Sequence, residues 1–297
     1  MPASAISRPL RDSILAWFDA TGRVLPFRDS TDPYAILVSE VMAQQTQIGR
    51  VGAAWRAWLE RFPTVDTLAA ATPADVLRQW AGLGYNRRAI QLHRAARVIV
   101  AEHMGHVPDS VEALEALPGI GPYTARAVVA IAFGRPVGAV DTNVRRVISR
   151  VVAGDPAGLP EPRIQALADS AVSRERPAAW THALMDVGAT FCRPRNPLCG
   201  GCPARAWCRY ARAAAGGGAD APAARRAKPA QRFATTTRWL RGRIVERLAG
   251  EDGWTAIRGS IGEHPADAVA SALTALRRDG IVELHPADET LARLAQT

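Results

Sequence analysis

The first 210 residues predict an all-α protein, and residues 232–297 predict a small separate α+β domain. Three observations support this division. Helix start signals recur through residues 1–210, where no strand-like alternation of apolar and polar residues is convincing. Residues 211–231 are rich in Ala, Gly, Pro and Arg, a composition typical of a flexible basic linker. All the cysteines lie within residues 192–208, near the end of the all-α region.

The expected helices of the first region begin at recognisable residues. Asp32 and Thr72 each place an N-cap acceptor before a proline at the first helical position. Asp109 and Glu112 have capping-box spacing before a short apolar helix. From there the pattern predicts helices at 111–117, 122–134, 144–152, 161–174 and 178–191.

The tail predicts helices at 238–249 and 266–278, followed by a turn and a short strand at 280–284. The order helix, helix, strand favours a winged-helix-like domain. Residues 229–297 contain nine basic and nine acidic residues. This neutrality argues against strong phosphate binding by the tail.

Charge and hydropathy exclude several classes of protein. The 297 residues include 37 Lys and Arg against 28 Asp and Glu, a net charge of +9 that falls on the all-α region and the linker. With 48% hydrophobic residues the chain can bury a core, so it is not disordered. No apolar run is long enough to span a membrane, and the charged N-terminus lacks a signal-peptide core. We therefore expect a cytoplasmic protein with a polyanionic partner, nucleic acid above all, although an Arg-rich composition bias explains the charge equally well.

The cysteines follow the spacing C-x6-C-x2-C-x5-C and are Cys192, Cys199, Cys202 and Cys208. Four thiols in so short a segment of a cytosolic protein indicate a site for a soft metal. Zinc sites of this kind usually contain two C-x2-C pairs, and this loop contains one. A wider loop favours a [4Fe–4S] cluster, with zinc as the second alternative.

Two glycines and a following helix start suggest an anion site at residues 117–122. Gly119 and Gly121 allow a tight turn and a close approach of another surface. The helix expected from Pro122 directs its free N–H groups toward the same place, as a DNA phosphate requires. An ordinary helix–helix turn is the alternative.

Two carboxylates are expected in opposite surroundings. Glu40 lies within an apolar helical run, and burial there would favour its protonated form. Asp141 lies at an expected helix N-cap, where N–H groups favour the ionised form. Such a pair suits cleavage of a glycosidic bond, in which one acid protonates the leaving group and one carboxylate stabilises the sugar cation. An exposed glutamate and a simple N-cap are the alternatives.

Six motifs, in this order, resemble those of MutY-like adenine DNA glycosylases, a branch of the helix–hairpin–helix (endonuclease III) superfamily. They are L-P-F-R at 25–28, S-E-V-M-A-Q-Q-T-Q at 39–47, G-L-G-Y at 82–85, L-P-G-I-G-P-Y-T-A at 117–125, V-D-T-N-V at 140–144, and the four-cysteine loop. The resemblance covers about residues 8–210 and implies a two-lobed, all-α helix–hairpin–helix glycosylase fold with a [4Fe–4S] loop.

The resemblance also implies roles for individual residues. Glu40 matches the acid that protonates adenine N7 and later handles the water. Asp141 matches the carboxylate that stabilises the sugar cation, Asn143 its supporting neighbour, and Tyr123 a tyrosine beside the reaction centre. The four cysteines match the ligands of a cluster that serves structure and DNA binding.

DNA contacts follow in the same way. Gln45 and Tyr85 match residues that enter the base stack while adenine is flipped out. Arg28 matches a residue that lines the adenine pocket. The other expected DNA- and base-binding residues are Thr46, Gly119, Gly121 and His182. The implied partner is double-stranded DNA that contains an adenine mispaired with 8-oxoguanine or guanine, bound by a nucleoid-associated monomer.

Lysine usage separates this chain from endonuclease III, which attacks the sugar with a lysine and cleaves the strand. The chain places Tyr123 within the motif that holds that lysine, and its only lysine is Lys228, in the linker. We therefore expect a monofunctional glycosylase that leaves an abasic site.

The chain departs from the family pattern at Ala43, Asn86 and His182. These departures leave open a thymine or uracil mismatch glycosylase of the same superfamily. The tail is too short for the larger C-terminal domain with which the family recognises 8-oxoguanine. A non-enzymatic iron–sulfur DNA-binding sensor is a third hypothesis, in which Glu40 and Asp141 are dispensable.

Overall fold

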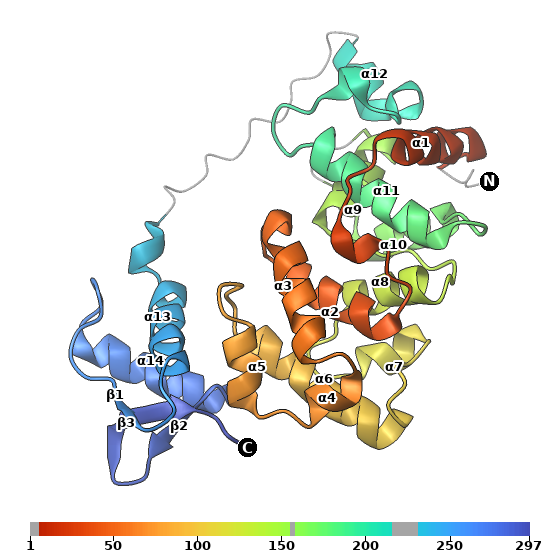
Figure 1. The fold of residues 1–297 in the computed structure, drawn as a ribbon. Helices are drawn as coiled ribbons and strands as arrows, with labels where there is room; N and C mark the ends of the chain where they lie inside the picture. The colour runs from red at the N-terminus through yellow and green to blue at the C-terminus, as the bar shows by residue number, and fades with distance from the viewer. Residues whose placement is uncertain (1–5, 155–157, 216–230) are drawn as a thin grey trace. The chain divides into compact units, whose positions relative to one another are not determined.

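The computed structural model describes residues 6–154, 158–215 and 231–297 (Figure 1). The first two ranges are helical, and the third adds two helices and a small sheet. The α-helices are α1 (Arg8–Thr21), α2 (Pro33–Ala43), α3 (Ile48–Arg61), α4 (Val65–Ala69), α5 (Pro73–Gln79), α6 (Arg87–His103), α7 (Val111–Glu115), α8 (Pro122–Ala132), α9 (Thr142–Val152), α10 (Glu161–Ala171), α11 (Pro177–Thr190), α12 (Arg209–Ala215), α13 (Thr237–Ala249) and α14 (Ala266–Arg278). The strands are β1 (Thr255–Ala256), β2 (Val282–His285) and β3 (Asp288–Leu294).

Helix starts follow the expected caps, with one shift. Thr72 Oγ1 accepts a hydrogen bond from the Asp75 amide at 3.1 Å and begins α5. The capping box expected at Asp109 is wrong by one residue, because Ser110 Oγ accepts from the Ala113 amide at 3.2 Å. Asp109 instead forms an ion pair with Arg135.

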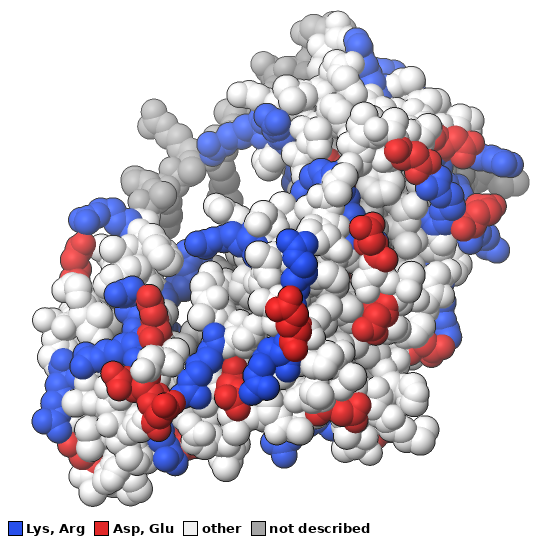
Figure 2. All heavy atoms as spheres, in the orientation of Figure 1, with Lys and Arg blue, Asp and Glu red and all other residues white. Residues whose placement is uncertain are grey.

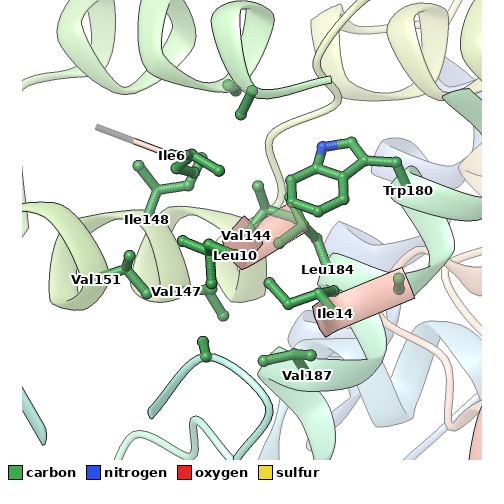
Figure 3. Packing of buried hydrophobic residues seen from close by; sticks show 14 of the residues in the cluster. Ile6, Leu10, Ile14, Val144, Val147, Ile148, Val151, Trp180, Leu184 and Val187 are labelled. Carbon is green, nitrogen blue, oxygen red and sulfur yellow. The ribbon is translucent and has the colours of Figure 1, made fainter. Parts of the chain in front are cut away.

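The described chain divides into two compact units. The first comprises Met1–Leu37, Asp109–Glu115 and Gly121–Ala227. Its core lies where α1, α9 and α11 meet (Figure 3). Apolar residues recur on one face of α1 and of α9, whereas α11 is buried on most of its surface, so the three helices share a cluster. The cluster includes Leu10, Ile14, Val147, Ile148, Trp180 and Leu184.

The second unit comprises Val38–Pro108, Ala116–Ile120 and Lys228–Thr297. Trp58 lies at the centre of its helical part, with edge-to-face contacts to Phe62 at 5.0 Å and Trp80 at 5.5 Å between ring centroids. Both tryptophans are fully buried. Rings in this geometry add to the stabilisation that burial itself provides.

The C-terminal part of this unit is an α+β domain. Its antiparallel sheet has the order β1-β3-β2, with Val282 opposite Leu294. The sequence predicts β2 but not β1 or β3, although buried Ala292 and Leu294 alternate with half-buried Arg293 in β3. The prediction of an all-α region followed by a small α+β domain is confirmed.

Part of the expected linker is helical, since α12 extends to Ala215. Residues 216–230 lie outside the described residues.

Among the helices of the described chain, none combines the length and the apolar character that a membrane span needs.

Candidate active site

Asp141 caps α9 and uses both of its carboxylate oxygens. Oδ1 accepts from the Val144 amide at 2.7 Å, and Oδ2 accepts from Asn143 Nδ2 at 2.9 Å. A short cap and a neighbouring amide therefore fix the orientation of the carboxylate. The side chain remains half-buried, so a ligand can reach it.

Arg146, one turn further along α9, holds Asn143 in place. Its Nη2 donates to Asn143 Oδ1 at 2.7 Å and to the Gly188 carbonyl at 2.9 Å, and its Nε donates to the Cys192 carbonyl. A Cβ added at Gly188 would lie 2.5 Å from Asn143 Cβ. Only glycine at this position therefore lets α11 approach α9 this closely. A chain of hydrogen bonds thus joins the cysteine loop to Asp141.

Helix α11 carries the other groups of this unit's site. Tyr123 donates from its hydroxyl to Met185 Sδ at 3.1 Å. Asp186 is fully buried and accepts from Arg28 Nη1 and Nη2 at 2.8 and 2.7 Å and from Arg23 Nε at 2.7 Å. Burial opposes ionisation, but the hydrogen bonds from Arg28 and Arg23 outweigh it and lower the pKa of Asp186 below its usual value.

His182 lies one turn before Asp186 and is buried. Burial, reinforced by the positive charge of Arg28, lowers the pKa of His182 to about 3, so the ring is neutral at pH 7. Its ring stacks on Phe18 with centroids 6.5 Å apart. Neither ring nitrogen has a hydrogen-bond partner among the described residues, an unusual condition for a buried polar group.

Sequence reasoning missed Asp186 and Arg23, which form the buried ion-pair cluster beside His182. Asp186 is the one acid within the apolar run of α11, as Glu40 is in α2. The same signal that identified Glu40 therefore identifies Asp186.

Glu40 lies in α2 on the second unit. Its exposed fraction is 6%, and its neighbours along the helix, Val38 and Met42, are fully buried. The expectation that Glu40 is buried is therefore confirmed.

The residues expected to enter the base stack have an uncommon backbone conformation. Gln45 and Tyr85 have φ values of 54° and 49°. Within the described residues only two other non-glycine residues have positive φ. Such conformations cost free energy and cluster at functional sites, which agrees with a special role for these two loops.

Arg88 ties the two loops together, and sequence reasoning did not identify it. Its guanidinium lies over the rings of Trp80 and Tyr85, at 5.2 and 5.6 Å from their centroids. Burial lowers the pKa of Arg88 to about 10, so it stays charged at pH 7. Its acceptors are the carbonyl oxygens of Val41, Met42, Gln44, Leu83 and Gly84 and the Thr46 hydroxyl, at 2.5 to 3.3 Å.

The two glycines of the hairpin turn differ in backbone conformation and in the space around them. Gly119 has φ 77°, and a Cβ added there would lie 2.5 Å from Gln91 Cβ. Gly121 is the N-cap of α8 with negative φ, and an added Cβ would meet nothing within 4 Å. Gly119 thus serves the fold, whereas Gly121 leaves open space beside the helix start.

The four cysteines line one pocket between α9, α11 and the 199–208 loop. Burial raises the pKa of Cys202 to about 11 and that of Cys208 above its usual value, so these two free thiols are neutral at pH 7. Arg150 lies beside them, with Nη1 3.4 Å from Cys192 Sγ. In the described parts of the chain, no three His, Cys, Asp or Glu side chains converge on a point suited to a single metal ion. A cavity ringed by thiols with a cation beside it fits a larger anionic group.

Comparisons with known proteins agree with these features. Residues 38–170 match the HhH-GPD superfamily base excision DNA repair protein. Adenine DNA glycosylase of Mycobacterium tuberculosis (strain ATCC 25618 / H37Rv) is 44% identical over 255 residues, which cover 84% of this chain and 82% of that protein. The human adenine DNA glycosylase is 43% identical over 211 residues, which cover 67% of this chain and 39% of that protein.

Two solved structures align with this chain. A thermostable thymine-DNA glycosylase aligns with a TM-score of 0.65 and 30% identity over 68% of this chain and 94% of that one. An endonuclease III–DNA complex aligns with a TM-score of 0.61 over 72% and 99%, and at 23% identity it shows the fold alone. Because the mycobacterial protein is 44% identical over 84% of this chain, the chain belongs to the adenine DNA glycosylase family of the HhH-GPD base excision repair superfamily.

Proposed function

We propose that this protein is an adenine-specific DNA glycosylase of base excision repair that acts on adenine opposite 8-oxoguanine or guanine. The observation that carries the proposal is the contrast between its two carboxyl groups. Glu40 is 6% exposed within the apolar run of α2, whereas Asp141 is half-buried with both oxygens held by N–H donors. One group suits a proton donor and the other a fixed negative charge.

In the proposed reaction the bond between C1′ and adenine N9 breaks, and its electron pair leaves with the base. Glu40 donates a proton to adenine N7, which makes adenine a better leaving group. The carboxylate of Asp141 stabilises the positive charge that develops on the sugar. Water then adds to C1′ and returns its proton to Glu40, so the products are adenine and an abasic site.

His182 and its neighbours suit recognition of a flipped adenine. Neutral imidazole offers one donor and one acceptor, and adenine presents an N6 amino donor and ring-nitrogen acceptors. One ring nitrogen of His182, neither of which has a hydrogen-bond partner among the described residues, would therefore bond to the edge of the base. Arg28, fixed by Asp186, would complete this surface.

The four cysteines that line the cavity beside Arg150 would hold a [4Fe–4S] cluster. When bound, such a cluster makes the cysteine loop rigid, so that the loop presents its basic side chains to DNA. Arg193, Arg195 and Arg205 of the loop are exposed and provide that positive charge.

A single-turnover assay on duplexes that contain dA opposite 8-oxoguanine or dG tests the proposal. Glu40→Gln should abolish excision with DNA binding retained, and Glu102→Gln, an exposed glutamate of α6, serves as the control. Asp141→Asn keeps a good N-cap acceptor but removes the charge, so excision should fall at least 100-fold without loss of stability. Absence of adenine release from every duplex would contradict the proposal.

A second candidate function is release of thymine or uracil opposite guanine. The likeness to a thermostable thymine-DNA glycosylase favours it, because that likeness covers 68% of this chain. The same assay on T:G and U:G duplexes separates the two functions by the base that is released.

A further inference from the structure

Arg238, the second residue of α13, lies on Tyr85. Its Nη1 donates to the Tyr85 hydroxyl, and its guanidinium carbon is 5.0 Å from the centre of the Tyr85 ring. The same guanidinium is 4.8 Å from the ring of Phe233, in the turn before α13. The C-terminal domain therefore reaches the residue expected to enter the base stack, and both belong to one compact unit.

The helix that carries Arg238 is also held at its other end by hydrogen bonds to α5, so the contact with Tyr85 does not depend on one side chain alone. Arg78 of α5 donates from Nε to the Ala249 carbonyl at 3.2 Å, at the end of α13. Its Nη2 donates to the Glu251 carbonyl at 3.2 Å and to Asp252 Oδ1 at 3.0 Å. One end of α13 is thus fixed to α5 while its other end faces Tyr85.

Arg238 differs from its neighbours in charge compensation. Arg241 is paired with Asp279, and Arg243 with Glu246. Within residues 6–154, 158–215 and 231–297, Arg238 forms no ion pair and is exposed. Figure 2 shows basic and acidic side chains interspersed over the face where Figure 1 places α13 and α5. The tail therefore has no net charge as a whole but carries, beside Tyr85, a cation without an acidic partner in the described chain.

Phe233 is one of the few large apolar side chains of the described chain that face solvent, with an exposed fraction of 55%. Exposed aromatic rings interleaved with arginine are typical of nucleic-acid surfaces, because rings stack on bases and guanidinium groups bind phosphates. The exposed ring of Phe233 shares the Arg238 guanidinium with Tyr85, so an aromatic ring and a cation without an acidic partner among the described residues lie side by side on this surface.

We propose that Phe233 and Arg238 form, with Tyr85, a duplex-DNA contact surface, which we call the 85/238 surface, and that the C-terminal domain thereby takes part in DNA recognition. The inference rests on the proposed function only in taking Tyr85 as the residue that enters the base stack. Arg238 would bind a phosphate next to that point, and Phe233 would pack on the sugar or base beside it. A neutral domain could thus contribute to affinity through one local group.

Fluorescence anisotropy of the full chain with a labelled duplex tests this surface. Glu40→Gln serves as the background so that the A:8-oxoguanine substrate stays intact. Arg238→Ala should weaken binding about tenfold and reduce the slope of log K against log salt by about one, as the loss of one phosphate contact requires. Phe233→Ala should weaken binding without changing the salt slope. Arg243→Ala, on the same helix and paired with Glu246, should change affinity less than twofold.

Two results would overturn the proposal. Equal affinity and salt slope for Arg238→Ala and Arg243→Ala would show that the surface does not touch DNA. Tighter binding by Arg238→Ala would show that the contact restrains Tyr85 instead. Arg238→Lys guards against a folding artefact, because it keeps the charge and should keep the salt slope while losing part of the affinity. If wild-type protein released no adenine but Arg238→Ala still lost binding, the proposed function would fail and the 85/238 surface would stand.

Discussion

His182 and Asp186 lie one turn apart on α11 and are both buried, yet their charges differ. Asp186 has four hydrogen bonds from Arg23 and Arg28, which keep it ionised. His182 faces the same arginines, and neither of its nitrogens has a hydrogen-bond partner in the described part of the chain, so burial and the positive charge of Arg28 keep it neutral. Partners rather than burial alone therefore decide which of the two carries charge.

The neutral state of His182 predicts a pH-dependent stability. Its pKa is about 3 in the folded protein and 6.5 when unperturbed. Between these values the unfolded chain binds a proton that the folded protein does not, so stability falls as the pH drops below 6.5. At pH 5 this amounts to about 2 kcal/mol, from about 1.4 kcal/mol per pH unit.

Urea unfolding at pH 7.5 and pH 5 measures this effect. His182→Gln should lose about 2 kcal/mol less than the wild type between the two pH values. His106→Gln, which changes an exposed histidine, should keep the wild-type difference. An unchanged difference in His182→Gln would show that this ring takes up a proton in the folded state.

At the scale of elements, the hairpin between α7 and α8 was predicted from its sequence. The different roles of its two glycines were not. Both glycines fit a tight turn equally well in the sequence. The left-handed φ of Gly119 and its contact with Gln91 appear only when α6 packs against the turn. Gly121 has neither constraint.

Alanine substitutions should separate the two roles. Gly119→Ala should lower the melting temperature by several degrees, since a residue with Cβ at this φ costs about 1–2 kcal/mol before the clash is counted. Gly121→Ala should leave the melting temperature nearly unchanged but weaken DNA binding several-fold, because its Cβ would occupy the space for a phosphate. Thermal melts and anisotropy measure both, and a stable Gly119→Ala variant would refute the assignment.

At the scale of the whole molecule, the lack of lysine in residues 1–210 limits the reaction. A Schiff base with the sugar needs an amine, and besides the N-terminal amine the chain offers only Lys228, which follows the catalytic region in the sequence. We expect the product strand to remain intact until it is heated in alkali. Borohydride should trap no covalent adduct, whereas an endonuclease III with its lysine should be trapped in a parallel reaction. Strand cleavage without alkali would contradict this.

Sequence by itself determined the helical class, most helix starts, the four-cysteine loop and the two carboxylates, because each depends on local signals within a few residues. Glu40 was identified because a lone acid in an apolar helix is visible in the pattern. The absence of lysine was equally plain. These features need no knowledge of what lies across the fold.

Only the tertiary structure decided the partners of those groups. Arg88 binds backbone carbonyls of two loops about 40 residues apart, Arg146 joins Asn143 to the cysteine loop, and Arg238 reaches Tyr85 across 153 positions. An arginine in a basic chain has no sequence signal that tells which acceptor it will meet. That choice depends on how helices pack, and packing brings together residues whose separation along the chain carries no local information.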